Sequence, residues 1–347
     1  MNLIDYTLKL TEEDYHNMPA WSYSIISKYA KEGFAALATL EERTAPTPSM
    51  EFGSLFDSIL TKGKKTLDDY VVFDKDVPSA EKKVIDYLID NNIIANSLTE
   101  ITREEYTKAT EACEYYLKWG LDARMKHIYE YEDYYQVAKS KKKIVSKLDW
   151  EDAIEMARVF RQDKYLQNLF GVKNTEDIEY IYQAQFATEM ILPSNRVVNV
   201  KIMPDLLKIN HKEKTIQPVD LKTSTIPAWN FKENFLKFRY DLQASVYTDV
   251  LRKIISTCDD VKDYTILPYL FTDISRSDKV PVTYLYDQTS EEQANGFTMT
   301  IGEKTYSYKH WTTLLDEIIN YKETEAKVPS YITTEGPNDI LTIINIK

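Results

Sequence analysis

The sequence predicts a mixed-sheet α/β domain, in which helices flank a central β-sheet and a helical region precedes it. Residues 79–170 follow a helical pattern almost throughout. Residues 180–285 contain short β-branched or apolar runs separated by turns, and residues 310–322 are helical again. Helices on both sides of a block of strands are typical of a sheet whose faces are covered by helices.

The chain of 347 residues is expected to form one domain, although its length alone also allows two. Within residues 1–347, we expect 79–170 to be a mainly helical insertion or subdomain and 180–325 to be the strand-rich core. Hydrophobic residues make up 43% of the chain, which is enough for a sizeable core. The net charge of −12 at pH 7 argues against a protein that coats nucleic acid by net charge alone, but it is compatible with a local basic channel.

The N-terminal part is predicted to be helical with one clear break. Apolar residues recur at helical intervals over 22–40, and a second helix is expected over 50–61. Between them, residues 42–48 contain two prolines, which cannot continue a helix. Further on, Thr102 is followed three residues later by Glu105, which indicates a capping box at a helix N-terminus.

An amphipathic helix is expected over 149–170, and the most basic stretch of the chain, 138–147, lies just before it. A charge run of this kind is most often a solubilising loop or helix face. In an enzyme acting on nucleic acid, such lysines would instead contact phosphates without regard to sequence. The lysines concerned are Lys139, Lys141, Lys142 and Lys143. The large apolar residues of 149–170 are expected in the core: Trp150, Met156, Phe160 and Tyr165.

Several kinds of site are not expected from the composition. Cys113 and Cys258 are the only cysteines and lie far apart, so one chain can form neither a disulfide framework nor a four-cysteine zinc or iron–sulfur site. The four histidines have no paired spacing, so we do not expect a histidine-based metal site. The sequence contains no signal peptide and no membrane-spanning apolar run, so we expect a soluble intracellular protein.

A β-hairpin is predicted at the centre of the strand-rich region. Residues 196–209 and 215–221 are mostly β-branched or apolar, and the polar run 210–214 between them indicates the turn. Centring this turn between Lys212 and Glu213 sets the register of the hairpin. Further strands are expected over 183–191, 264–273 and 280–285, with a turn at 193–195.

This register brings two acids and a lysine together. Asp205 falls directly opposite Asp220, where Cβ atoms are roughly 5 Å apart and like charges repel, so the pair favours a cation. Lys222 points to the same face because a strand has a period of two. Asp and Lys on a hairpin most often form a solvated face, so the triplet alone carries little weight.

Residues on either side of the hairpin complete an ordered set of motifs. Gly53 and Asp57 are one helical turn apart before it, and Gln243 and Tyr247 are one turn apart after it. The order is G-x-x-x-D, P-D, D-L-K-T-S and Q-x-x-x-Y. It resembles the PD-(D/E)xK nuclease superfamily, and within it the RecB-like and RecE-like exonucleases, whose pattern is G-x-x-x-H, a strand Asp, (D/E)-x-K and Q-x-x-x-Y.

The resemblance extends beyond the motifs, with two departures. Residues 21–27 resemble the serine-rich N-terminal segment of that family, and residues 285–325 resemble its closing strand and helix. Asp57 stands where the family has histidine. Met203-Pro204 replaces the glycine often found before the strand aspartate.

The resemblance implies a PD-(D/E)xK nuclease core and a Mg²⁺-dependent deoxyribonuclease, with Mn²⁺ as a substitute and no iron–sulfur cluster. Lys222, Gln243 and Tyr247 would join the two aspartates in catalysis. Glu189 is alternatively an edge-strand carboxylate, and Asp57 alternatively lies on a solvated helix face. The implied metal ligands are Asp205, Asp220, the carbonyl of Leu221, Asp57 and Glu189; the implied phosphate contacts are Arg239, Lys139, Lys141, Lys142 and Lys143.

Family analogy favours an end-dependent exonuclease of recombination or repair, encoded by a phage and acting in the cytoplasm of a bacterial host cell. DNA would be its substrate, with a single-strand annealing or recombination protein as partner, a ring-shaped homo-oligomer as assembly, and no membrane. The alternative is a non-catalytic DNA-binding or assembly protein that keeps the nuclease fold with a degraded site, which Asp57 favours. Action on ends or internally, strand polarity and the number of metal ions stay open at this point.

Overall fold

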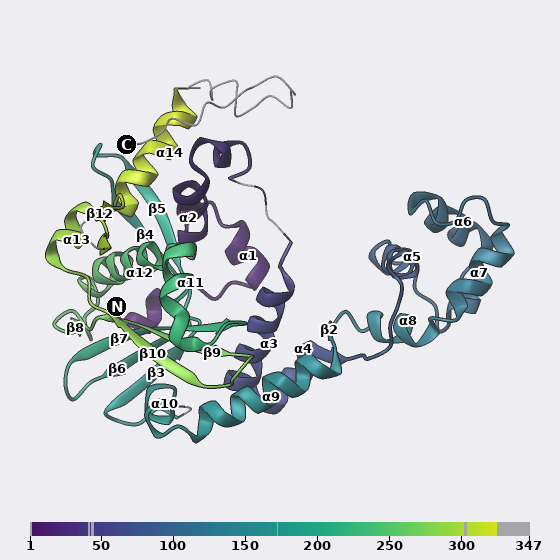
Figure 1. The fold of residues 1–347 in the computed structure, drawn as a ribbon, viewed down its shortest axis with the longest axis horizontal. Coiled ribbons are helices and arrows are strands. Elements are labelled where there is room, and N and C mark those ends of the chain that lie inside the picture. The colour runs from purple at the N-terminus through teal and green to yellow at the C-terminus, as the bar shows by residue number, and fades with distance from the viewer. Residues whose placement is uncertain (1, 41, 43–44, 172, 302–303, 325–347) are drawn as a thin grey trace. The chain divides into compact units, whose positions relative to one another are not determined.

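The structure is a computed structural model that describes residues 2–324 except 41, 43–44, 172 and 302–303 (Figure 1). It divides into two compact units. We call them the sheet unit, which comprises Met1–Thr47 and Val159–Lys347, and the helical unit, Pro48–Arg158. The helical unit overlaps the insertion expected over 79–170, but it begins earlier in the chain and ends earlier.

A six-stranded mixed sheet forms the centre of the sheet unit, as the sequence predicts (Figure 1). In spatial order its strands are β10 (Pro281–Tyr286), β9 (Tyr269–Ser275), β7 (Thr215–Ser224), β6 (Leu206–Asn210) and β3 (Ile178–Tyr182), with the short β8 (Thr265–Ile266) beside β7. The long strand β7 is antiparallel to β6 and parallel to β9. It therefore lies in the interior of the sheet, where both of its edges are hydrogen-bonded.

The predicted hairpin is confirmed together with its register. Leu206 of β6 lies opposite Val219 of β7, and the turn between the two strands occupies 211–214. One further step of the same register brings Asp205 opposite Asp220. The polar run that separates the two apolar segments was therefore a reliable marker of the turn.

The first arm of this hairpin is two strands rather than the single strand expected over 196–209. The chain forms β5 (Val197–Ile202), leaves it at Met203-Pro204 and then begins β6. Proline has no N–H group to donate to a ladder, so pairing is interrupted there. β5 pairs with β4 (Phe186–Ile191) in a separate two-stranded sheet.

Two other predicted strands have different bounds in the structure. The strand expected over 183–191 starts only at Phe186, because Gln183 adopts a left-handed backbone with φ 47° and separates β3 from β4. The strand expected over 264–273 is split into β8 and β9 next to Pro268. The sequence pattern did not indicate α13 (Ser290–Asn295), β11 (Thr298–Ile301) and β12 (Lys304–Ser307).

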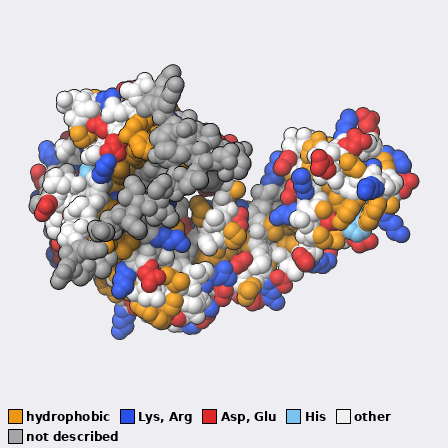
Figure 2. Space-filling model, turned by 45° about the horizontal axis from the view of Figure 1, so that its top comes forward, with side chains coloured by type: hydrophobic (Ala, Val, Ile, Leu, Met, Phe, Trp, Pro, Cys, Tyr) orange, Lys and Arg blue, Asp and Glu red, His pale blue; other side chains and the backbone are white. Residues whose placement is uncertain are grey.

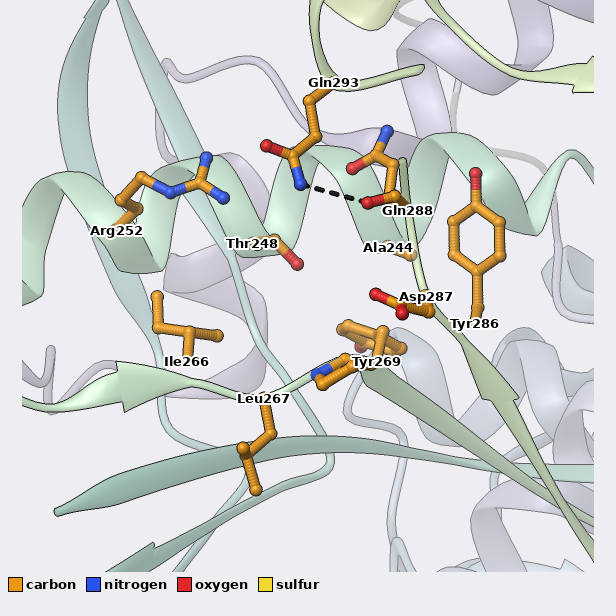
Figure 3. Close-up of a pocket in the computed structure, with 11 residues that line it drawn as sticks. Ala244, Thr248, Arg252, Ile266, Leu267, Tyr269, Tyr286, Asp287, Gln288 and Gln293 are labelled. Atoms are coloured by element: carbon orange, nitrogen blue, oxygen red, sulfur yellow. Dashed lines mark hydrogen bonds between the residues drawn. The ribbon is translucent and has the colours of Figure 1, made fainter. Parts of the chain in front are cut away.

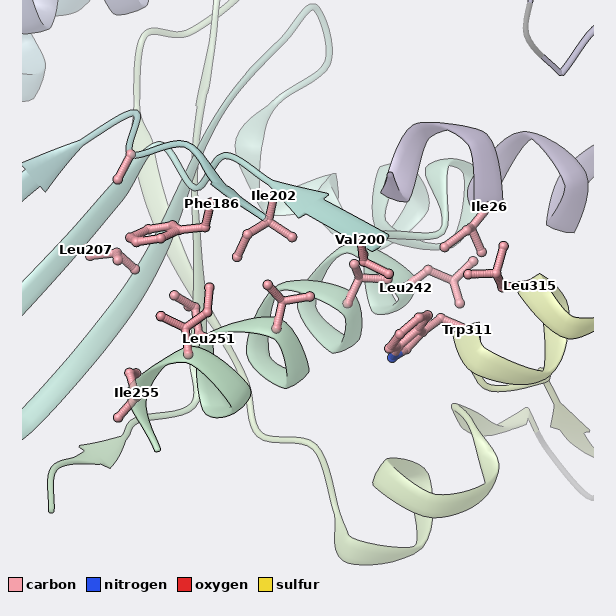
Figure 4. Close-up of a cluster of buried hydrophobic side chains, with 14 of the residues drawn as sticks. Ile26, Phe186, Val200, Ile202, Leu207, Leu242, Leu251, Ile255, Trp311 and Leu315 are labelled. Atoms are coloured by element: carbon pink, nitrogen blue, oxygen red, sulfur yellow. The ribbon is translucent and has the colours of Figure 1, made fainter. Parts of the chain in front are cut away.

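One long helix covers the face of the sheet that carries Asp220. This helix, α12 (Tyr240–Ile255), packs against α2 (Tyr23–Glu32), α14 (Trp311–Glu323), β4 and β5 around a common apolar core (Figure 4). Each large apolar side chain buried there contributes roughly 1.5–3 kcal/mol, so the position of α12 over the sheet is well determined. The helices of the sheet unit are α1 (Glu12–Asn17), α2 (Tyr23–Glu32), α10 (Lys164–Leu169), α11 (Phe231–Phe238), α12 (Tyr240–Ile255), α13 and α14 (Trp311–Glu323).

The helical unit has a hydrophobic core of its own. The predicted capping box is confirmed, since the side chains of Thr102 and Glu105 each accept a hydrogen bond from the other's backbone N–H at the start of α6 (Arg103–Ala112). Residues 79–170 are not helical throughout, because β2 (Lys143–Val145) is a strand that pairs in parallel with β1 (Tyr70–Val72). The elements are α3 (Pro48–Lys62), α4 (Thr66–Asp69), β1 (Tyr70–Val72), α5 (Ser79–Asp90), α6 (Arg103–Ala112), α7 (Leu121–Tyr129), α8 (Glu132–Ala138), β2 (Lys143–Val145) and most of α9 (Lys147–Gln162), whose residues 159–162 belong to the sheet unit.

The helix expected over 149–170 is two helices, α9 and α10. Asp163 separates them, because its side chain accepts a hydrogen bond from the N–H of Leu166 and caps α10. Met156 and Phe160 are buried as expected, whereas Tyr165 is 56% exposed and does not belong to the core. Trp150 is half-buried.

Charged side chains of both signs are interspersed on the surface that faces the viewer in Figure 2. The net charge of −12 is therefore not concentrated in one acidic field on the described part of this face. Of the helices that the structure describes, none combines the length and the apolar character needed to cross a lipid bilayer.

Candidate active site

The sheet unit brings together the acids and the lysine predicted from the hairpin. The Nζ atom of Lys222 lies 2.6 Å from Oδ2 of Asp220. Asp205, directly before β6, accepts a hydrogen bond on Oδ2 from the backbone N–H of Leu221 at 2.7 Å. The N–H and C=O groups of one strand residue point to the same side, so the carbonyl of Leu221 also faces Asp205. Three of the predicted metal ligands are thus neighbours.

Helix α12 contributes the two residues of the last motif. Nε2 of Gln243 donates a hydrogen bond to Oδ1 of Asp220 at 2.5 Å. Tyr247, one helical turn later, packs edge-on against Tyr269 with 6.2 Å between ring centroids. Burial, followed by the negative charge of Asp220, raises the pKa of Tyr247, so its hydroxyl stays protonated. Asp220 is therefore located on strand β7, and a side chain of helix α12 fixes its carboxylate.

The Asp220–Lys222 ion pair is largely shielded from water. Asp220 is 2% exposed, and the side chain of Lys222 is 22% exposed. Burial raises the pKa of Asp220, whereas Lys222 and the hydrogen bond from Gln243 lower it. Burial would lower the pKa of Lys222, but its neighbours together outweigh burial and raise this pKa, with Asp220 contributing most and Tyr240, Asp205 and Tyr23 adding to it. The ammonium group therefore keeps its charge at neutral pH.

Two tyrosines that the motifs do not include complete the surroundings of Lys222. Its Nζ lies 4.6 Å from the ring centroid of Tyr240, in a cation–π contact. Tyr23 of α2 is also close enough to interact with this charge. Burial raises the pKa of Tyr23, and the positive charge of Lys222 lowers it. Tyr23 belongs to 21–27, so the segment that resembles the family's N-terminal segment reaches the site. Nothing in the sequence marked Tyr240, which is one aromatic among many.

A third acid beside Lys222 was also missed. Asp273 of β9 is paired with Lys222 in the parallel β7–β9 ladder, so both side chains point to the same face. The residue is fully buried, its Oδ2 accepts a hydrogen bond from Ser224 at 3.0 Å, and its Oδ1 has no hydrogen-bond partner among the described residues. Burial raises the pKa of Asp273 to about 7, against the lowering by Ser224 and Lys222. Its only sequence signal was a position at the end of the expected strand 264–273.

Asp273→Asn is expected to make the free energy of unfolding less dependent on pH. The carboxyl ionises near its usual pKa of 3.8 in the unfolded chain and near 7 in the folded protein. The wild type therefore loses stability as the pH rises from about 4 to about 7, at about 1.4 kcal/mol per pH unit at most. Asparagine releases no proton. The free energy of unfolding of the variant relative to that of the wild type should therefore increase across this window and stay constant at higher pH.

Urea unfolding of both proteins between pH 5 and pH 8 measures this difference. Asp177→Asn is a suitable control, because Asp177 is an exposed acid of the same unit. Parallel pH profiles for the wild type and Asp273→Asn would show that Asp273 ionises normally.

The donor atoms at the site suit a hard divalent cation. The carboxylates of Asp205 and Asp220 and the carbonyl of Leu221 provide oxygen ligands, which Mg²⁺ and Mn²⁺ prefer. Oε1 of Gln243 is buried beside Asp220 and has no hydrogen-bond partner among the described residues, so an unused acceptor is present there. The described residues contain no group of three His, Cys, Asp or Glu side chains placed to hold a metal. Backbone, amide or water oxygens would complete the coordination.

Glu189 lies outside this arrangement, and Asp57 belongs to the other unit. Glu189 is exposed on β4 and lies opposite Asn199 in the two-stranded sheet. This position agrees with an edge-strand carboxylate, the alternative to a metal ligand. Asp57 lies on α3 in the helical unit, half-buried, one turn after Gly53. The proposed role of Asp57 as a metal ligand stays a prediction.

The guanidinium group of Arg239 is already bound within the protein. Its Nε and Nη2 atoms donate to the two carboxylate oxygens of Asp241, each at 2.9 Å, and its Cζ lies 4.6 Å from the ring centroid of Tyr308. Arg239 is buried and has a left-handed backbone, φ 58°, between α11 and α12. A phosphate would have to compete with Asp241 for this side chain.

The four lysines predicted to contact DNA lie around β2 in the helical unit. Nζ of Lys139 donates to the carbonyl of Ala95 at 3.0 Å, and Nζ of Lys142 donates to the carbonyl of Leu67 at 2.7 Å. These two ammonium groups therefore stabilise the unit itself. The other two, Lys141 and Lys143, are exposed, and Lys143 also lies over the ring of Tyr70 at 5.8 Å.

A separate hollow of about 110 Å³ lies beside α12 (Figure 3). Ala244, Thr248 and Arg252 form one side of it, and Tyr269 forms part of another. Its lining includes none of Asp205, Asp220 and Lys222. The buried acids and the lysine, rather than this hollow, are therefore the candidate catalytic groups.

Comparison with models of known protein families and with curated proteins finds no match for this chain. Its function is accordingly inferred from the site and from the order of its motifs.

Proposed function

We propose that this protein is a metal-dependent deoxyribonuclease with a core of the PD-(D/E)xK type, which hydrolyses DNA phosphodiester bonds at Asp205, Asp220 and Lys222. The observation that supports it most is the ion pair between Lys222 and Asp220. The hairpin register places Asp205 opposite Asp220, and Gln243 donates a hydrogen bond to Asp220. Such a cluster combines oxygen ligands for a cation with a charged donor for phosphate. A merely solvated hairpin face would expose these groups to water, whereas Asp220 is buried.

Each residue of the proposed site has a defined role. Asp205, Asp220 and the carbonyl of Leu221 would hold Mg²⁺ or Mn²⁺, which when bound activates water and offsets the charge of the phosphate. Lys222 donates to the attacking water or to a phosphate oxygen and stabilises the negative charge that develops there. Gln243 keeps the carboxylate of Asp220 from rotating, because its amide holds Oδ1.

The surroundings of Lys222 make its charge effective. The ring of Tyr240 restricts the position of the ammonium group, and low exposure reduces screening by water. Asp220 keeps Lys222 protonated, so the residue acts as a fixed positive charge and not as a base. We further propose, from the resemblance alone, that the enzyme starts from DNA ends and serves recombination or repair.

Digestion of linear and of closed circular DNA tests this function. With Mg²⁺, the purified protein is expected to degrade end-labelled linear duplex, to leave the closed circle intact and to stop on addition of EDTA. Lys222→Met provides the matched inactive protein. Cutting of the circle would support the nuclease proposal but refute end dependence. DNA binding without any cutting would favour a non-catalytic DNA-binding or assembly protein.

A further inference from the structure

An exposed aromatic ring lies next to the ring that covers Lys222. Phe238, the last residue of α11, is 37% exposed, and its centroid is 5.7 Å from that of Tyr240 at an interplanar angle of 31°. The ammonium group of Lys222 also contacts the ring of Tyr240, with its Nζ 4.6 Å from the ring centroid. The exposed ring is therefore one aromatic contact away from the proposed catalytic lysine.

The backbone at Phe238 is held in place from both sides. The hydroxyl of Tyr23 donates to the carbonyl of Phe238 at 2.6 Å. The next residue, Arg239, is in the left-handed region, which is unfavourable for a residue with a Cβ, and its bonds to Asp241 secure it there. A ring carried on a fixed backbone position requires less ordering when a ligand binds, which favours affinity.

Positive charge accompanies this ring. The Nζ atom of Lys237 lies 5.3 Å from the centroid of Phe238, and Lys232 is also exposed on α11. Trp229, in the short helix η5 (Ala228–Asn230) just before α11, is 59% exposed. Aromatic faces combined with lysines match a nucleic-acid strand, which offers base faces and phosphates alternately. The charge of Arg239 is already paired with Asp241, so Lys237 supplies the phosphate contact.

We propose that Phe238, with Lys237, is a stacking site for an unpaired base of the DNA strand whose phosphate lies at Lys222. This proposal rests on the nuclease function proposed above. Inside a duplex both faces of a base are covered by its neighbours, so only a single-stranded or terminal base can stack on Phe238. The site thereby selects single-stranded or frayed ends as the substrate at the point of cleavage.

Binding of a fluorescein-labelled oligothymidylate in EDTA, where no cleavage takes place, tests the stacking site. Phe238→Ala is expected to weaken binding about tenfold, which corresponds to about 1.4 kcal/mol and lies in the range for one base on an aromatic ring. Phe238→Trp should retain the affinity, and Phe238→Leu, which is apolar but has no π face, should not. Tyr165→Ala, which removes an exposed ring elsewhere in the sheet unit, is the matched control.

A strand that carries 2-aminopurine adds a readout for stacking itself. The wild type should quench its fluorescence, whereas Phe238→Leu should not. Unchanged affinity of Phe238→Ala, full affinity of Phe238→Leu, or failure of the wild type to bind oligothymidylate would each overturn the stacking site, whatever the outcome of the cleavage assay. Binding through Phe238 by a protein that never cuts DNA would instead refute the nuclease and keep the stacking site.

Discussion

Lys222→Met is expected to slow Mg²⁺-dependent DNA cleavage by a factor of about 100 to 1,000, the usual effect of removing one preorganised donor to a developing negative charge. Methionine keeps an apolar stem beneath the ring of Tyr240 but removes the charge. The initial rate of label release from linear DNA, at saturating DNA and Mg²⁺, measures the effect.

Lys208→Met is a closely matched control for this variant. Lys208 is also a half-buried strand lysine, with its Nζ 5.9 Å from the ring centroid of Tyr180. It lies on β6 and bonds Asn168, outside the proposed site. Cleavage by Lys208→Met should equal that of the wild type, and a similar rate for Lys222→Met would exclude Lys222 from the chemistry.

Breaking the Asp220–Lys222 pair is expected to lower the free energy of unfolding, and to do so unequally for the two partners. Lys222→Met leaves a carboxylate that is 2% exposed without its cation, which costs about 3–5 kcal/mol. Asp220→Asn leaves an ammonium group that is 22% exposed, can turn toward water and keeps its contact with Tyr240, so the loss should be smaller. The double variant has no unpaired charge and should recover most of the loss.

Urea unfolding of the wild type, both single variants and the double variant at pH 8 forms a double-mutant cycle. At lower pH the loss in Lys222→Met should shrink, because burial already raises the pKa of Asp220 and protonation removes its unpaired charge. Strictly additive losses would mean that the two residues do not stabilise each other in the folded protein.

The hairpin was predictable because local chemistry determines it. A polar run between two apolar segments sets the turn, and the period of two then decides which residues share a face. Asp205, Asp220 and Lys222 follow from these two rules without any knowledge of the tertiary fold. Gln243 follows from helical periodicity, although its bond to Asp220 depends on how α12 packs against the sheet.

Features that depend on packing between distant segments were not predictable. The run 196–209 is mostly β-branched or apolar on both sides of Met203-Pro204, so its pattern does not show that the chain changes sheets there. Asp273 lies beside Lys222 only because β9 pairs with β7. The same limitation applies to Glu189, whose neighbours are set by β5 and not by the hairpin.

In the sequence, the helical unit lies between the N-terminal segment and the residues of the sheet unit that this segment contacts. This order has a consequence during synthesis on the ribosome. The N–H of Trp21 donates to the carbonyl of Asn199, and the N–H of Leu3 donates to Asp260. At about 5–20 residues per second, Trp21 waits roughly 10 to 40 s for Asn199 to be made. The helical unit, by contrast, is continuous in sequence and is complete well before. Its folding should come first, while apolar residues such as Ile26 remain accessible to chaperones until β5 emerges.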